Sequence, residues 1–140
     1  MTITVKRITP RDETLFDSVA EDVFDEAIDP GLLRAYLRQP GHLMVLAFEG
    51  PLVVGQCAAV LHRHPDKPVE LYIDEVGTAT SHLRQGIATA LMEEMFRWGR
   101  ELGCTEAWLG TEIDNTAANA LYRQFKPKED EPFQYYLFDI

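Results

Sequence analysis

The sequence has few cysteines and no long apolar run, and each shortage excludes a class of protein. Cys57 and Cys104, the two cysteines among 140 residues, make neither a disulfide framework nor a metal-binding quartet. No apolar run approaches the roughly 20 residues that a membrane-spanning helix needs, and Met1 to Pro10 lacks the apolar core of a signal peptide. A cytoplasmic protein without a membrane partner is therefore expected.

Basic residues are also scarce, because 13 Lys and Arg stand against 23 Asp and Glu and give a formal net charge of −10. Binding to nucleic acid depends on neutralising phosphates with basic side chains, so a nucleic-acid partner is not expected. A negative field steers cations toward the surface, which fits a small amine such as a polyamine or an aminoglycoside. The same charge could instead serve solubility alone.

The sequence lacks both common nucleotide-binding loops, G-x-x-x-x-G-K-[ST] and G-x-G-x-x-G. What it has is the stretch from Asp74 to Ala88, where an apolar strand with two carboxylates runs into a glycine-containing turn and a helix. The unpaired N–H groups of a first helical turn, with the helix dipole, would hold a phosphate placed before Gly86, and Arg84 could add a cation. The alternative is that Gly86 only permits a tight turn.

The segment Leu83 to Ala88 resembles the acyl-CoA signature of the GNAT superfamily of N-acetyltransferases, [RQ]-x-x-G-x-[GA]. Leu83 departs from it, which removes one possible side-chain contact and leaves those of the backbone. The longer stretch Tyr72 to Leu91, with H-x-R-Q-G-I-A-T-A-L, looks most like the aminoglycoside 3-N-acetyltransferase branch. The resemblance implies that acetyl-CoA is the co-substrate. The residues it assigns to acetyl-CoA binding in this stretch are Val76, Gly77, Thr78, Arg84, Gln85, Gly86, Ile87, Ala88 and Thr89.

A second segment, Asn115 to Tyr122, resembles the other superfamily signature, N-x-x-A-x-x-L-Y. The resemblance implies that Asn115 and Ala118 lie against the pantetheine arm and that the Tyr122 hydroxyl protonates the departing CoA thiolate. On its own, Asn115 would be read as a helix cap. The glycine that usually follows in the family is missing, since Tyr122 is followed by Arg-Gln-Phe-Lys-Pro.

Two adjacent acids, Asp74 and Glu75, interrupt an otherwise apolar strand, where an unpaired buried charge is costly. Strand alternation would send them to opposite faces, so one of them is expected to face the site. The resemblance makes Glu75 the general base that removes a proton from the attacking amine. Asp74 is the second candidate for this role. The alternative is an ion pair with an arginine. Asp22, Asp25, Glu26 and Asp29 are candidate contacts for a cationic acceptor, or else a solvated acidic face.

The hydrophobic pattern predicts alternating strands and helices along one domain, residues 1–140. Helices are expected over Arg11–Phe24, after Asp29 and before Pro40, over Gly86–Gly103 with Ile87, Leu91, Met95, Trp98 and Leu102 in the core, and from Asn115 to about Gln124. Strands are expected over Thr2–Ile8, His42–Glu49, Leu52–His62, Leu71–Thr78, Glu106–Thr111 and Phe133–Phe138. This order matches the GNAT fold, an α/β (α+β) domain with a mixed, largely antiparallel sheet flanked by helices.

His62, His64 and Asp66 alternate in a way that could place metal ligands on one face, but they stand at a Pro-containing strand end with no further ligand in view. No metal is therefore expected. The whole pattern predicts acetyl transfer from acetyl-CoA to a small primary amine by direct attack, without an acyl-enzyme. A protein or peptide acceptor and a non-catalytic acyl-CoA-binding module are the alternatives. The family often dimerises, and the aromatic last strand offers one surface for a second copy.

Overall fold

A computed structural model describes residues 2–140 and divides the chain into two compact units, Met1–Trp108 and Leu109–Ile140. The first unit contains a five-stranded sheet in sequence order: β1 (Ile3–Arg7), β2 (His42–Glu49), β3 (Leu52–His62), β4 (Glu70–Thr78) and β5 (Ala107–Trp108). The strands pair antiparallel except for β4 and β5, which run parallel. The expected mixed, largely antiparallel sheet is confirmed, although β5 is shorter than predicted.

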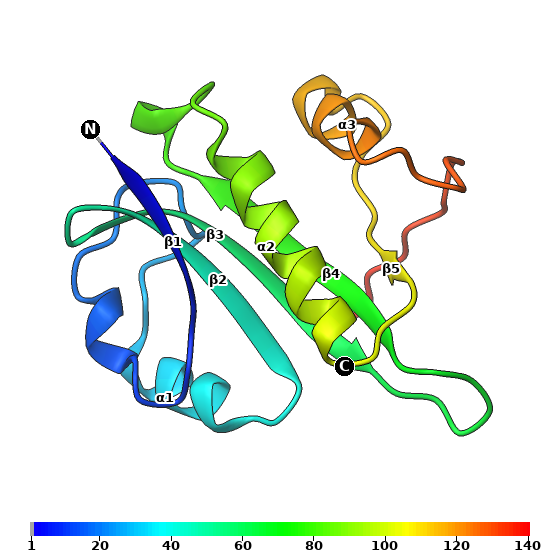
Figure 1. The fold of residues 1–140 in the computed structure, drawn as a ribbon, viewed down its shortest axis with the longest axis horizontal. Coiled ribbons are helices and arrows are strands. Elements are labelled where there is room, and N and C mark those ends of the chain that lie inside the picture. The colour runs from blue at the N-terminus through cyan, green and yellow to red at the C-terminus, as the bar shows by residue number, and fades with distance from the viewer. Residues whose placement is uncertain (1) are drawn as a thin grey trace. The chain divides into compact units, whose positions relative to one another are not determined.

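Helix α2 (Ile87–Glu101) lies along one face of the sheet, as Figure 1 shows. Two glycines permit this close packing: a Cβ added at Gly55 of β3 would lie 2.8 Å from Ile87, and one at Gly99 of α2 would lie 2.8 Å from Leu71 of β4. The side chains of Ile87, Leu91 and Met95 are buried, as the spacing predicts. The packing of α2 fixes where its first turn lies relative to β3 and β4.

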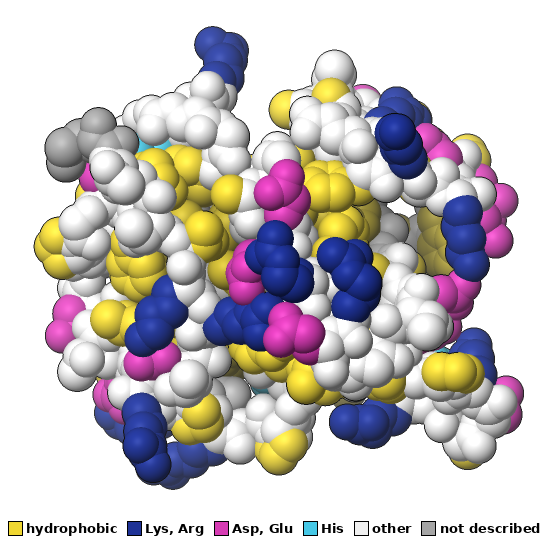
Figure 2. All heavy atoms as spheres, in the orientation of Figure 1, with side chains coloured by type: hydrophobic (Ala, Val, Ile, Leu, Met, Phe, Trp, Pro, Cys, Tyr) yellow, Lys and Arg dark blue, Asp and Glu magenta, His cyan; other side chains and the backbone are white. Residues whose placement is uncertain are grey.

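Two residues predicted for the core of this helix lie at its margin. Leu102 is 43% exposed, because the helix ends one residue earlier, at Glu101. Trp98 is half-buried, and the guanidinium of Arg7 lies 5.3 Å from its ring centroid. Arg7 also pairs with Glu94 and Glu101, and Figure 2 shows basic and acidic side chains side by side over the outer face of α2. This face of the unit is neutralised locally.

The helix predicted over Arg11–Phe24 is wrong. A single 3-10 turn, η1 (Glu13–Phe16), is present, and the chain then runs along β3, with the Ala20 N–H donating to the Val53 carbonyl and the Val53 N–H to that of Ser18. Asp22 has a φ of 69°, which a right-handed helix does not allow. Pairing with the sheet therefore replaces helical hydrogen bonding over residues 18–20.

Helix α1 (Pro30–Arg38) agrees with the helix predicted after Asp29 and before Pro40. The Asp29 carboxylate accepts from the Leu32 N–H at 2.9 Å, and proline occupies the first helical turn, where its missing N–H costs nothing. Leu33 is buried and Tyr36 is half-buried. Asp29 thus has a structural role as the N-cap of α1.

The second unit contains helix α3 (Thr116–Arg123), capped by the predicted Asn115, whose side chain accepts from the Ala118 N–H at 3.1 Å. Lys126 has a φ of 54° and takes the left-handed position after the helix that glycine commonly occupies. The predicted last strand is wrong: residues 133–138 pair with no strand in the part of the chain that the structure describes, and their side chains are exposed. Among residues 2–140, no helix is long and apolar enough to cross a bilayer.

Candidate active site

The acidic pair on β4 coincides with an irregularity in the sheet. Ala58 of β3 faces Glu75 and Ala59 faces Ile73, so Asp74 is an extra residue with no partner in the register. Such β-bulges are common beside active sites, because they redirect a side chain and open the strand locally. The strict alternation used to predict opposite faces for Asp74 and Glu75 does not hold across this bulge.

Glu75 is held by a buried amide. The Gln56 Nε2 donates to Glu75 Oε1 at 2.9 Å and to the Val23 carbonyl at 3.3 Å, and Gln56 is fully buried on β3. Sequence reasoning missed Gln56, although a lone amide inside the apolar run from Leu52 to Leu61 was a usable signal. The amide fixes the carboxylate of Glu75 while leaving it half-exposed to the site.

The surroundings of Glu75 raise its pKa. Burial is the largest cause, the negative charges of Asp25 and Asp74 add to it, and the hydrogen bond from Gln56 opposes it. A carboxylate with a raised pKa is a stronger base once ionised, which suits the removal of a proton from an ammonium group.

Tyr36 of α1 lies near the same carboxylates and was not among the predicted site residues. Its hydroxyl donates to the Leu43 carbonyl at 3.2 Å. Burial raises the pKa of the Tyr36 hydroxyl, and the charges of Asp74 and Glu75 raise it further, so both acids act on one phenol. This part of the first unit therefore offers a cationic ligand the carboxylates of Asp74 and Glu75 and the neutral hydroxyl of Tyr36.

The acids predicted as acceptor contacts take different positions. Asp22 accepts from the Thr80 hydroxyl at 2.5 Å, which joins the segment before α1 to the short 3-10 turn η2 (Thr80–His82). Asp25 is exposed and influences Glu75 electrostatically, whereas Asp29 caps α1. Glu26 is exposed. Asp25 is therefore the member of this group that the structure brings to Glu75.

The edge of β4 that leads from Glu75 toward α2 contains Val76, Gly77 and Thr78, all half-buried. Within the described residues, β4 pairs with β5 only at Leu71 and Tyr72, so the strand beyond them has no ladder partner on that side. An open strand edge offers N–H and C=O groups that an extended ligand can pair with.

The turn before α2 has the backbone shape of an anion site. Arg84 and Gly86 both have positive φ, 61° and 76°, and Gly86 at the N-cap has no side chain to cap the first turn. Arg84 and Gln85 are exposed at this turn, whereas the Ile87 side chain is in the core and only its backbone can face a ligand. Ala88 and Thr89 complete the turn as half-buried residues.

The predicted residues of the second unit lie on one face of α3. Ala118, Leu121 and Tyr122 are half-buried, while Asn115 caps the helix through its side-chain oxygen. The predicted site residues therefore form two groups. One lies around β4 and the first turn of α2, in the first unit, and the other lies on α3, in the second unit.

Neither cysteine is poised as a nucleophile. Cys57 is fully buried, which raises the pKa of its thiol to about 12, and burial also raises the pKa of Cys104. A protonated, buried thiol is inert, because the thiolate is the reactive form. The first unit thus provides carboxylates and the Tyr36 phenol, rather than an activated thiol, near Glu75.

Comparison with known proteins places this sequence among acetyltransferases. The model of the acetyltransferase (GNAT) family matches residues 9–126. Aminoglycoside N(6')-acetyltransferase type 1 of Acinetobacter haemolyticus is 26% identical over 65 residues, and the match spans 46% of this chain and 45% of that protein.

Two solved structures are similar over the full length of both chains. An aminoglycoside acetyltransferase from an uncultured soil metagenomic sample superimposes with a TM-score of 0.80 at 25% identity. AAC(6')-Iy, in complex with the bisubstrate analogue CoA-S-monomethyl-acetylneamine, has a TM-score of 0.79 at 16% identity. Two of these relatives have names that state the position of acetylation, and in both it is the 6' amine. The assignment to the 3-N branch therefore stays a prediction.

Proposed function

Since the chain belongs to the GNAT family of acetyltransferases, we propose that it transfers acetyl from acetyl-CoA to the primary amine of a small cationic acceptor, aminoglycoside-like or polyamine-like. The observation that carries this proposal is Glu75: a half-buried carboxylate at a strand bulge, fixed by Gln56, with its pKa raised by burial and by Asp25 and Asp74. Both units are taken to form one acetyltransferase domain.

Glu75 acts as the general base in this proposal. A primary amine is protonated near neutral pH and must lose a proton before it can attack a thioester. A carboxylate within reach, directly or through one water, contributes about 10²- to 10⁴-fold. Asp74 and Asp25 attract the cationic acceptor and keep the Glu75 pKa raised, so they serve both binding and basicity.

Two backbone segments bind the donor in this proposal. The N–H groups of the first turn of α2, with Arg84 beside them, hold the pyrophosphate of the nucleotide. The unpaired edge of β4 from Val76 to Thr78 pairs with the pantetheine arm, and an N–H near Val76 stabilises the oxyanion. Acetyl-CoA supplies the activated thioester, the amine attacks its carbonyl carbon directly, and CoA leaves as the thiol.

Residues of α3 complete the reaction. Asn115 uses its side-chain oxygen to cap the helix, which leaves the NH₂ group as its donor toward the pantetheine arm. Tyr122 gives its phenolic proton to the CoA thiolate as the C–S bond breaks. Both assignments rest on the N-x-x-A-x-x-L-Y pattern and on the half-buried face of α3.

The test is release of free CoA thiol from acetyl-CoA across a panel of aminoglycosides, polyamines, amino acids and lysine peptides. Turnover confined to small polyamines or aminoglycosides, lost in Glu75→Gln, is the expected result. Activity on lysine peptides alone would assign a protein acceptor. Calorimetric binding of acetyl-CoA without turnover on any amine would replace the enzyme with a binding module.

A matched pair of variants separates the two proposed roles. Glu75→Gln keeps the hydrogen bond from Gln56, because the new amide oxygen can still accept, but it removes the base. Tyr122→Phe removes the phenolic proton without changing the ring. Glu75→Gln should recover rate at high pH, where more of the amine is already neutral, whereas Tyr122→Phe should lower turnover with little change in CoA affinity.

A further inference from the structure

Three potential metal ligands meet at the end of the β3–β4 hairpin. His62 is the last residue of β3, Glu70 is the first of β4, and the antiparallel register places them opposite each other. His64 follows two residues after His62 in the connecting loop, residues 63–69. The hairpin register thus supplies the carboxylate that the local sequence pattern lacked, and it is Glu70 rather than the Asp66 considered from sequence.

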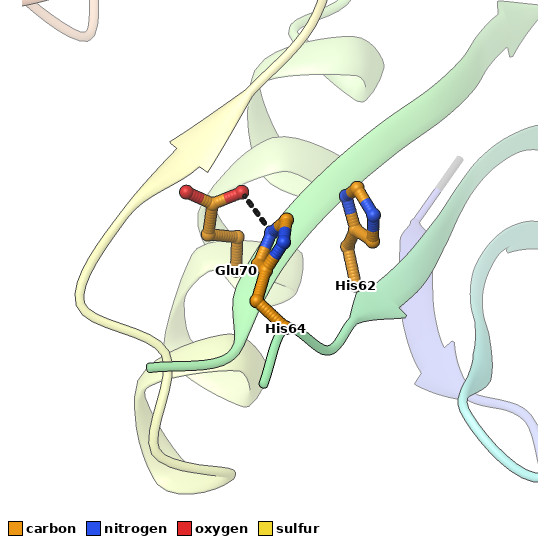
Figure 3. A group of neighbouring side chains, drawn as sticks. All are labelled: His62, His64 and Glu70. Carbon is orange, nitrogen blue, oxygen red and sulfur yellow. Dashed lines mark hydrogen bonds and ion pairs between the residues drawn. The ribbon is translucent and has the colours of Figure 1, made fainter. Parts of the chain in front are cut away.

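The geometry of this cluster is compatible with coordination. The imidazole of His64 lies between the other two side chains in Figure 3, with its Nε2 3.0 Å from Glu70 Oε1 and its ring centroid 4.2 Å from that of His62. One donor atom from each residue lies within 4.8 Å of the other two. Donors at about 2.1 Å from one ion are about 3.0 to 4.2 Å apart, depending on the angle between them. His62 is the exposed member of the three, so a rotation of its ring is the movement that binding would require.

The arrangement leaves room for water on the ion. His64 and Glu70 have 18% of their side chains exposed, so they form the enclosed side, whereas His62 is exposed. Three protein ligands with open positions are typical of zinc and related ions. Two imidazoles favour a late first-row divalent ion over Mg²⁺ or Ca²⁺, which prefer oxygen ligands. The net charge of −10 also favours a cation.

We propose that His62, His64 and Glu70 bind one divalent transition-metal ion, with Zn²⁺ as the biological candidate, and that the ion fastens the 63–69 loop to the end of the sheet. Glu70 precedes Glu75 by five residues on β4, about 16 Å along a strand, so this site is separate from the proposed acetyl-transfer site. The ion therefore takes no part in acetyl transfer.

The test uses tag-free full-length protein that has been freed of metal by a chelator. Zn²⁺ binding is followed by titration calorimetry, and Co²⁺ by its visible absorption, which reports nitrogen and oxygen ligation directly. One ion per chain is expected, and a saturating ion should raise the melting temperature because it binds the folded state. Absence of saturable one-to-one binding in the wild-type protein would overturn the proposal.

Variants locate the site. His62→Ala changes an exposed side chain and so preserves the fold, and Glu70→Gln is nearly isosteric; each should weaken Zn²⁺ binding at least tenfold and abolish the thermal shift. His82→Asn is the matched control, because His82 also faces a carboxylate, Glu49, at 3.3 Å but belongs to no group of three ligands within the described residues. Equal binding in all three variants would refute the assignment.

A neighbouring charge, that of Lys67, gives a further test of the metal site. Lys67 in the same loop acts electrostatically on Glu70, so it opposes a second positive charge there. Lys67→Ala should tighten Zn²⁺ binding severalfold at low ionic strength, with less gain at high salt. Unchanged or weaker affinity in Lys67→Ala would contradict an ion beside Glu70.

Discussion

Gly77 is the position where one added methyl group should matter most. A Cβ at Gly77 would lie 2.3 Å from the Val23 carbonyl oxygen, whereas ordinary contacts begin at 3.4 Å. Both partners are backbone atoms or are fixed to backbone, so no side chain can rotate away. Gly77→Ala must therefore push the Val23 segment and β4 apart by about 1 Å, against the Gln56 hydrogen bond to the same carbonyl.

Overpacking of this kind costs about 1–3 kcal/mol of unfolding free energy. For a chain of this size that corresponds to a fall in melting temperature of about 3 to 12 °C. The assay is thermal and urea unfolding followed by circular dichroism, together with acetyl-transfer rates at a temperature where the variant is folded. The rate should also fall, because the shift separates Gln56 from Glu75 or from Val23.

Gly110→Ala is the matched control. No atom lies within 4 Å of a Cβ at Gly110, and its φ is not in the left-handed region, so the methyl group meets no obstacle. Its stability should be unchanged or slightly increased, by up to about 1 kcal/mol. Equal stability of the two variants would refute the close approach of the Val23 segment to β4, and with it the anchoring of Glu75 through Gln56.

The remaining predictions concern charge, thiols and a helix cap. Asp25→Asn removes one cause of the raised Glu75 pKa, so the acidic limb of the kcat/KM profile should move to lower pH; an unmoved limb would separate Asp25 from Glu75. Because the Glu75 pKa is raised, the ionised carboxylate lowers stability above that pKa and has no such effect below the unfolded value. Glu75→Gln should therefore be more stable than wild type at pH 7, and this difference should disappear as the pH falls from the raised pKa to the ordinary glutamate value, as urea unfolding at several pH values would reveal. Cys57 and Cys104 should resist a thiol reagent at pH 8 and both react in denaturant, whereas a fast-reacting thiol in the native protein would contradict their burial. Asp29→Ala should cost about 1 kcal/mol by uncapping α1, and Asp29→Ser should restore most of it in the same unfolding assay.

Local sequence was sufficient for the elements that depend on local physics. The spacing of Ile87, Leu91 and Met95 predicted the buried face of α2, and the cap at Asn115 predicted where α3 begins. Helix α1 begins directly after Asp29, as predicted, although the role of Asp29 as its N-cap was not predicted. The failures were segments whose state depends on distant partners. Residues 18–20 hydrogen-bond to β3 instead of forming the predicted helix, and residues 133–138 have strand composition but pair with no strand in the described chain.

The sequence alone determined the family, the order of the elements and the residue types of the candidate site, because motif spacing and periodicity are properties of neighbouring residues. Only the tertiary structure decided how those residues meet. The bulge at Asp74, the Gln56 bond to Glu75 and the approach of Val23 to Gly77 all depend on register between strands and segments far apart in the chain. The same is true of Glu70 beside His62 and His64, since a one-residue slip of β4 along β3 would send the carboxylate to the other face of the sheet.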